Sequence, residues 1–180
     1  MQLGQLAIDS HGGYHAAWTE TDGSQAFTVQ YRFSKDGGHT WTPAEQLDSG
    51  TADNPGRIGF QLVAGSAGQV HLAWDADRAI HYRGRGVQNG WGAPVTLSSD
   101  ALNSGVVLAV AKDGSARAAW QISAADSSVV MRVQSADGAW GPPVTVTPTQ
   151  AFALALAVDA GGVSHVLWQA GDGLRYLALP

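Results

Sequence analysis

The sequence contains no cysteine, few charged residues and no long apolar run. Without cysteine, the chain cannot form disulfides, thiolate zinc sites or thiol nucleophiles. Charged residues make up only 14% of the 180 residues, and the ten basic residues are spread along a chain of net charge −5. Nucleic acids and anionic membranes bind concentrated basic surfaces, so neither is expected as a partner. The longest apolar run, residues 151–158, is too short to span a bilayer.

Recognisable catalytic and targeting motifs are also missing. The first residues have neither a basic region nor an apolar region, so the sequence predicts no signal peptide in this form. No phosphate-binding loop, Ser–His–Asp arrangement or pair of carboxylates stands out, and the chain has only two glutamates, Glu20 and Glu45. We therefore expect no cofactor and assign no catalytic residue.

Seven tryptophans, in contrast, follow one repeating template. Four of them end a short phrase with His or Arg three residues earlier, and they are spaced by 56, 46 and 48 residues. The other three precede a proline and an alternating run, and they are spaced by 50 and 49 residues. A repeat of this length is typical of propellers and arrays. The first group is Trp18, Trp74, Trp120 and Trp168, and the second is Trp41, Trp91 and Trp140.

Within each repeat the pattern predicts four short antiparallel strands. The first strand is small and apolar, as in residues 6–8, 61–64, 107–110 and 154–158, and such runs suggest strands buried on both faces. Turns rich in Gly and Asp then lead into the strand that ends in the first tryptophan. A third strand follows, and a proline begins the fourth, where it is tolerated at a sheet edge.

This repeat predicts an all-β fold, a β-propeller-type array of four antiparallel blades. The blades cover approximately residues 1–55, 56–102, 103–149 and 150–180, as one propeller domain or as a half-propeller. Only twelve residues follow Trp168, whereas the earlier repeats need 23, 17 and 20 residues to reach their second tryptophan. The fourth blade is therefore expected to lack its outer strand and to leave its third strand as an open edge.

The loop after the first repeat's third strand resembles the Asp-box of the bacterial neuraminidase (BNR) repeat. The matching residues are Ser34, Asp36, Gly38, Thr40 and Trp41, and later copies of the motif are degraded. The resemblance implies a sialidase-like propeller, with the motif joining the third and fourth strands of a blade. Physically, such a carboxylate accepts backbone N–H groups in a turn while the tryptophan fills the space between strands, so we expect a structural role.

Sialidases, as this resemblance implies, use three arginines, a tyrosine nucleophile with a glutamate, and an aspartate. Neither Glu20 nor Glu45 is expected to lie beside a central tyrosine. Arg57 begins a segment similar to the family's Arg-Ile-Pro, although the proline is missing. We therefore predict no complete catalytic set. The binding candidates are Arg57, Asp22 and Asp53, which lie in or beside the long loops 21–26 and 48–56.

Two rows of polar residues recur at equivalent positions. The first contains His15, His71 and His165, with Arg117 in the same place. Equivalent positions on different blades are too far apart to share an ion, so we expect hydrogen bonds between blades and no metal site. The second row, on the third strands, contains Arg32, Arg83 and Arg132, for which we expect edge and inter-blade salt links.

Three functional hypotheses remain open. The first is a non-catalytic binding or scaffolding propeller that binds a glycan or a protein through its rim loops. The second is a fragment or subunit of a sialidase-like glycoside hydrolase, and the third is a purely structural, self-associating propeller piece. Open apolar faces favour self-association into a closed ring of two half-rings, or contact with further blades of a larger propeller. The family resemblance suggests an extracellular or cell-surface location.

Overall fold

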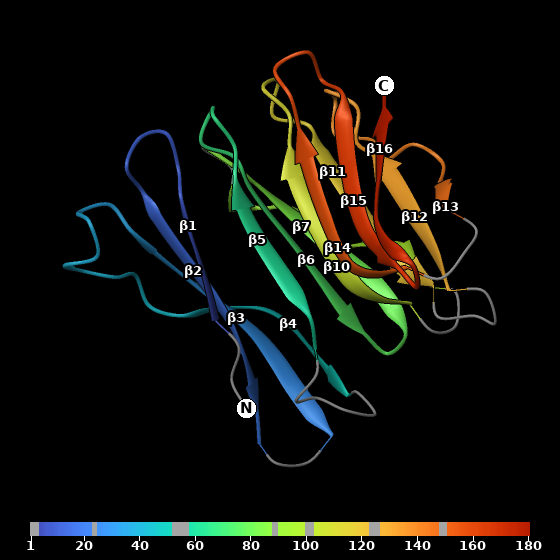
Figure 1. Ribbon diagram of the computed structural model, residues 1–180. Helices are drawn as coiled ribbons and strands as arrows, with labels where there is room; N and C mark the ends of the chain where they lie inside the picture. The colour runs from blue at the N-terminus through green and yellow to red at the C-terminus, as the bar shows by residue number, and fades with distance from the viewer. Residues whose placement is uncertain are drawn as a thin grey trace.

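The computed structural model describes residues 4–22, 25–51, 58–87, 90–99, 103–122, 127–147 and 151–180. These residues form β-strands and turns, and the strands make four antiparallel sheets that follow one another in chain order (Figure 1). The all-β prediction of four antiparallel sheets is confirmed. We call the sheets blades 1 to 4. No helix in the described ranges is long and apolar enough to cross a membrane.

Blades 1 and 2 contain four and five strands. Blade 1 has the order β1-β2-β3-β4, and in blade 2 the strands β8 and β9 both pair with β7. The strands of blade 1 are β1 (Gly4–Ile8), β2 (Tyr14–Thr21), β3 (Ala26–Ser34) and β4 (Glu45–Thr51). Those of blade 2 are β5 (Phe60–Ala64), β6 (Val70–Ala76), β7 (Ala79–Gly86), β8 (Gly90–Trp91) and β9 (Val95–Ser98).

Blades 3 and 4 contain four and three strands, so the prediction that the fourth blade lacks its outer strand is confirmed. The strands of blade 3 are β10 (Asn103–Val110), β11 (Ala116–Ile122), β12 (Ser128–Val133) and β13 (Val144–Thr147). Those of blade 4 are β14 (Phe152–Val158), β15 (Ser164–Ala170) and β16 (Gly173–Leu179).

Glycine closes the turn between the first and second strands of every blade. Each turn holds a glycine with a φ between 81° and 86°, a conformation that residues with a Cβ rarely adopt. The backbone N–H of this glycine donates to the carbonyl three residues earlier, so all four turns have the same geometry. The glycines are Gly12, Gly68, Gly114 and Gly162.

The hydrophobic core lies between the blades. Three clusters of buried side chains join blade 1 to blade 2, blade 2 to blade 3 and blade 3 to blade 4. Trp74 and Trp120 are fully buried in the first two clusters, and Trp168 belongs to the third. Because each cluster needs both of its blades, a blade is stabilised mainly by its neighbours.

The first strands of blades 1 and 4 differ from the sequence prediction. We expected first strands to be buried on both faces, but Leu6 and Ile8 in β1 are 56% and 54% exposed, and Ala155 and Ala157 in β14 are also exposed. Strand β10 contacts the strands of blade 2, and β14 contacts β10 and β11 of blade 3. Blade 1 lies at one side of the array (Figure 1), and among the described strands of the other blades its first two strands contact β5 of blade 2.

Candidate functional site

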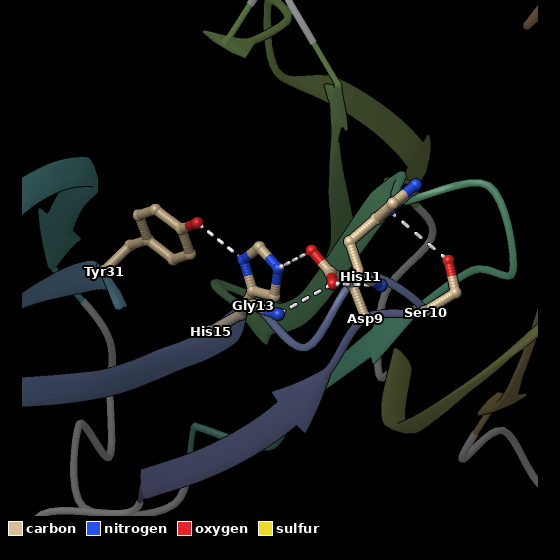
Figure 2. Close-up of polar contacts among 6 residues, drawn as sticks. All are labelled: Asp9, Ser10, His11, Gly13, His15 and Tyr31. Carbon is tan, nitrogen blue, oxygen red and sulfur yellow. Dashed lines mark hydrogen bonds and ion pairs between the residues drawn. The ribbon is translucent and has the colours of Figure 1, made fainter. Parts of the chain in front are cut away.

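Three titratable side chains in blade 1 form a chain of hydrogen bonds from Asp9 through His15 to Tyr31 (Figure 2). The Asp9 carboxylate lies in the turn after β1, where Oδ1 accepts the backbone N–H groups of His11 and Gly13 at 2.8 Å each. Its Oδ2 lies 3.0 Å from His15 Nε2, and His15 Nδ1 lies 2.7 Å from the Tyr31 hydroxyl. We call this arrangement the relay.

Electrostatics set the protonation states of the relay. Burial alone raises the pKa of Asp9, but the hydrogen bonds from His15, Gly13 and His11 outweigh it and hold that pKa below its usual value. Burial lowers the pKa of His15, while burial raises the pKa of Tyr31 to about 12. The carboxylate only accepts, so His15 Nε2–H donates to Asp9 and the Tyr31 hydroxyl donates to Nδ1.

The relay of blade 1 is shielded from solvent. His15 is fully buried and Tyr31 is 3% exposed. The Tyr31 ring packs edge-on against Trp91 of blade 2, with 5.0 Å between ring centroids and an angle of 86° between ring planes. The relay therefore orients a tyrosine ring for contact with the next blade.

Blade 2 repeats the arrangement with a shorter relay. His71 Nδ1 lies 2.7 Å from the Tyr82 hydroxyl, and the Tyr82 ring meets Trp140 of blade 3 edge-on at 4.9 Å. Burial lowers the pKa of His71 to about 4 and raises the pKa of Tyr82 to about 12. Gly65 stands where blade 1 has Asp9, so no carboxylate completes the relay.

Blades 3 and 4 depart from this pattern in different ways. In blade 3, Arg117 replaces histidine and donates to Ser115 Oγ at 2.7 Å. In blade 4 the full relay returns: His165 lies 3.2 Å from Asp159 Oδ2 and 2.6 Å from the Tyr176 hydroxyl. Here the relay faces solvent, and Tyr176 is 60% exposed.

These contacts correct part of our predictions. His15 and His165 form their side-chain hydrogen bonds within a blade, whereas we expected hydrogen bonds between blades. In blade 2 a contact between blades is present, because the Tyr82 hydroxyl also lies 3.5 Å from Gln134 Oε1 of blade 3. Trp41, which we expected to fill the space between strands, is 37% exposed, while Trp91 and Trp140 pack between blades. In the described part of the chain, no group of three or more His, Asp or Glu side chains is placed to hold a metal ion.

Two of the three third-strand arginines join blades, and they do so through carbonyl groups. Arg83 donates from Nη1 to the Leu47 carbonyl of blade 1 at 2.5 Å, and Arg132 donates to the Leu97 carbonyl of blade 2 at 2.8 Å. Arg32 lies over the Trp18 ring, 5.8 Å from its centroid. The expected salt links are therefore wrong for Arg83 and Arg132, because the preceding blade presents backbone oxygens at that place.

The loop between β3 and β4 forms a compact hydrogen-bonded hairpin from the five motif residues. Asp36 accepts the Thr40 backbone N–H at 2.8 Å, the Thr40 hydroxyl at 2.6 Å and the Ser34 hydroxyl at 2.8 Å. These hydrogen bonds from Thr40 and Ser34 hold the pKa of Asp36 well below its usual range. Ser34 Oγ also accepts the Gly38 N–H, and Trp41 Nε1 donates to the Gly38 carbonyl. The carboxylate is fully occupied by the turn.

Among the predicted binding residues, Asp22 lies in the described structure, and Arg57 and Asp53 lie outside the described residues. Asp22 lines a hollow of about 230 Å³ at the end of the β2–β3 hairpin, together with Glu20, Thr21, Ala26, Phe27 and Thr28. We call it the rim hollow. Glu20 Oε1 accepts the Trp18 indole N–H at 2.8 Å, and this hydrogen bond holds the Glu20 carboxylate in place.

Sequence reasoning missed two glutamines that join first strands. The Gln5 side chain donates to the Phe60 carbonyl at 2.8 Å and accepts the Leu62 N–H at 2.7 Å. Gln61 in blade 2 accepts the Leu108 N–H of blade 3. The signal in the sequence is a glutamine in the same place of two otherwise apolar first strands.

Solved structures with the same fold include two sialidases and an alpha-L-arabinofuranosidase. A Hadza microbial sialidase, Hz136, has a TM-score of 0.59 at 12% identity over 98% of this chain and 43% of its own. The NanB sialidase of Streptococcus pneumoniae has a TM-score of 0.54 at 17% identity, over 97% of this chain and 30% of its own. The alpha-L-arabinofuranosidase PaAbf62A of Podospora anserina has a TM-score of 0.52 at 14% identity, over 97% and 62%.

These likenesses show a sialidase-like β-propeller fold. No family model matches the sequence, and no curated protein matches it. The chain spans less than half the length of the two sialidases.

Proposed function

We propose that this sialidase-like chain is a non-catalytic binding or scaffolding propeller that binds a neutral glycan at the rim hollow. The state of the tyrosines supports a non-catalytic role, because a tyrosine nucleophile needs access to substrate and a base. Tyr31 and Tyr82 are buried, are hydrogen-bonded to histidine and have a pKa raised by burial to about 12. Tyr176 is exposed, but its partner is His165, whereas the sialidase resemblance implies a glutamate. Glu45 lies opposite Tyr31 in the strand register, beside a tyrosine that is only 3% exposed.

The rim hollow carries the binding proposal. It combines the carboxylates of Glu20 and Asp22 with the apolar side chains of Ala26 and Phe27. Carboxylates accept hydrogen bonds from sugar hydroxyls, and an apolar wall packs against the C–H face of a sugar ring. Two carboxylates in one hollow repel an anionic sugar, and the chain's net charge of −5 adds to this. We therefore expect neutral glycans, such as arabinose or hexose oligosaccharides, to bind in preference to sialosides.

A glycan array followed by calorimetric titration tests this proposal. The purified chain should bind neutral oligosaccharides on the array, and Asp22→Asn should weaken that binding about tenfold, as expected for the loss of one charge-assisted hydrogen bond. Glu45→Gln is the matched control, because it removes a carboxylate of the same blade away from the hollow, and it should bind like the unmodified chain.

Other outcomes would favour the alternatives. An empty array together with an empty pull-down would overturn the binding role and leave a purely structural piece. Turnover of a fluorogenic sialoside, lost in Arg57→Ala, would instead favour a subunit of a glycoside hydrolase. That second candidate is supported by the fact that the chain spans only 43% of the Hadza microbial sialidase.

A further inference from the structure

Every internal junction of the array joins the same two faces. The trailing face of a blade presents a small residue on the second strand and two larger residues on the third. In blade 1 these are Ala17, Val29 and Tyr31, and all three are buried against blade 2. By register the equivalent sets are Ala73, Ile80 and Tyr82 in blade 2, Ala119, Val129 and Met131 in blade 3, and Leu167, Leu174 and Tyr176 in blade 4.

The leading face of a blade presents a leucine from the middle of its first strand. Leu62 and Leu108 are 5% and 3% exposed, because they pack against the trailing faces of blades 1 and 2. Leu156 packs in the same way against blade 3. Leu6 is the equivalent residue of blade 1 by register, since each leucine lies opposite the residue two before the second-strand tryptophan.

The aromatic contacts follow the same rule. Trp91 of blade 2 meets Tyr31 of blade 1, and Trp140 of blade 3 meets Tyr82 of blade 2. The tryptophan always belongs to the leading face and the tyrosine to the trailing face. Trp41 is the corresponding tryptophan of blade 1 and Tyr176 the corresponding tyrosine of blade 4.

Each of the two outer blades has one uncovered face: the trailing face in blade 4 and the leading face in blade 1. On blade 4, Leu167, Leu174 and Tyr176 are 40%, 70% and 60% exposed, and His165 and Tyr176 line an apolar hollow of about 300 Å³. On blade 1, Leu6 and Trp41 are 56% and 37% exposed. The equivalent alanines, aliphatics and tyrosines of blades 1 and 2 are at most 4% exposed.

We propose that the trailing face of blade 4 binds the leading face of blade 1 of a second copy of this chain. Leu6 of the second copy then covers Leu167 and Leu174, and its Trp41 meets Tyr176 edge-on, as Trp91 meets Tyr31. The same contact in return, from the first copy's blade 1 to the second copy's blade 4, closes a twofold-symmetric ring of eight blades. This proposal goes beyond glycan binding and does not depend on it.

Complementarity makes a second copy the occupant. The two exposed faces are the two halves of a junction that the chain already forms three times in the same register, twice with a tyrosine against a tryptophan. Position 167 is the one clear departure, because leucine stands there in place of alanine. The larger side chain adds apolar surface and places the incoming β1 of the second copy farther out.

Molar mass in solution is the first test. Light scattering on the purified chain should give about 37 kDa, twice the 18.7 kDa of one copy. A mass of one copy at micromolar concentration would overturn the proposal and point to blades of another polypeptide, and a pull-down that recovers only other proteins would do the same.

Face variants then locate the contact. Leu6→Asp and Tyr176→Asp each place a charge on a surface residue of one face, and each should reduce the mass to that of one copy while the circular dichroism spectrum is kept. Val95→Asp is the control, since Val95 is 38% exposed on the outer strand β9 and should leave the mass unchanged. If the control dissociates equally, or neither face variant dissociates, the assignment of the faces is wrong.

Cross-linking tests the contact without relying on a loss of association. The chain has no cysteine, so Leu6→Cys combined with Leu167→Cys introduces the only two thiols. Oxidation should give a covalent dimer that reducing agent reverses. Leu6→Cys combined with Val144→Cys, an exposed residue of the outer strand β13, should give none. Equal cross-linking in both pairs would contradict the proposed geometry.

Discussion

The relays of blades 1 and 4 use the same three residue types in nearly the same geometry but in opposite surroundings. The Asp–His distance is 3.0 Å in blade 1 and 3.2 Å in blade 4, and the His–Tyr distances are 2.7 and 2.6 Å. Tyr31 is nevertheless 3% exposed and Tyr176 60% exposed. The local sequence of a blade builds the relay, and the next blade decides its burial.

This comparison also separates the contribution of a relay to the free energy of unfolding from the contribution of a junction between blades. In blade 1, loss of one partner would strand buried polar atoms, whereas in blade 4 water can replace it. The predictions below compare equivalent residues of inner blades and blade 4. The measurements of blade 4 variants use a Leu6→Asp background, in which the trailing face of blade 4 stays open to solvent.

The largest expected difference is between Ile80 and Leu174, which occupy equivalent positions in blades 2 and 4. Ile80 is fully buried, so Ile80→Ala should lower the free energy of unfolding by about 3 to 4 kcal/mol through lost burial and a residual cavity. Leu174 is 70% exposed, and Leu174→Ala should change it by less than about 0.5 kcal/mol. Urea unfolding followed by tryptophan fluorescence measures both, and equal losses would contradict the comparison.

The second expected effect is a pH dependence from His71. Burial lowers its pKa to about 4 in the folded chain, against 6.5 for an ordinary histidine. Between these values the unfolded chain binds more protons, so the contribution of neutral His71 is complete above pH 6.5 and is lost as the pH falls toward 4. The loss should approach about 3 kcal/mol over that window.

Urea unfolding at pH 7 and pH 4.5 measures this loss. His71→Gln should reduce the difference in unfolding free energy between the two pH values by up to about 3 kcal/mol, because glutamine does not titrate. His165→Gln in blade 4 is the matched control and should keep the difference. A pH dependence that survives in His71→Gln would place its origin in other groups.

The smallest expected difference is between the two relay histidines. His15→Ala should cost about 2 to 3 kcal/mol, because Asp9 and Tyr31 lose a buried partner and the ring leaves a cavity. His165→Ala should cost less than about 1 kcal/mol, since its partners reach water. Hydrogen exchange of the two β1–β2 and β14–β15 turns would report each effect locally. A larger loss in blade 4 would overturn the comparison.

The sequence predicted the strands well because each proline and turn glycine acts within its own blade, and the tryptophans recur at fixed places along the strands. Trp74 and Trp120 mark buried second strands. The outer strands β4, β9 and β13 each begin one or two residues after a proline, namely Pro43, Pro94 and Pro143. Contacts between blades were harder to predict, because they depend on how one sheet lies on the next. Arg83 and Arg132 were correctly expected to reach another blade, but their partners are backbone carbonyls, which a sequence does not distinguish.

The relay itself left a signal that could have been found. An aspartate stands six residues before the histidine in blades 1 and 4, as Asp9 before His15 and Asp159 before His165. The third strand carries a tyrosine wherever the second strand carries this histidine. Reading these three positions together predicts a hydrogen-bonded set inside blade 1 and inside blade 4. The rim hollow could be predicted only as a loop region, because its walls depend on the packing of Phe27.

The residue that precedes each second-strand tryptophan has a wider consequence. Where it is alanine, the next sheet approaches closely, and where it is leucine, three further carbon atoms stand in the way. In the proposed assembly, Leu167 separates its sheet from the next more widely than an alanine does, and the angle between neighbouring sheets, summed around an axis, sets how many sheets complete a circle. Exchanging alanine and leucine at this single position should therefore change the curvature of the whole assembly, independent of any ligand.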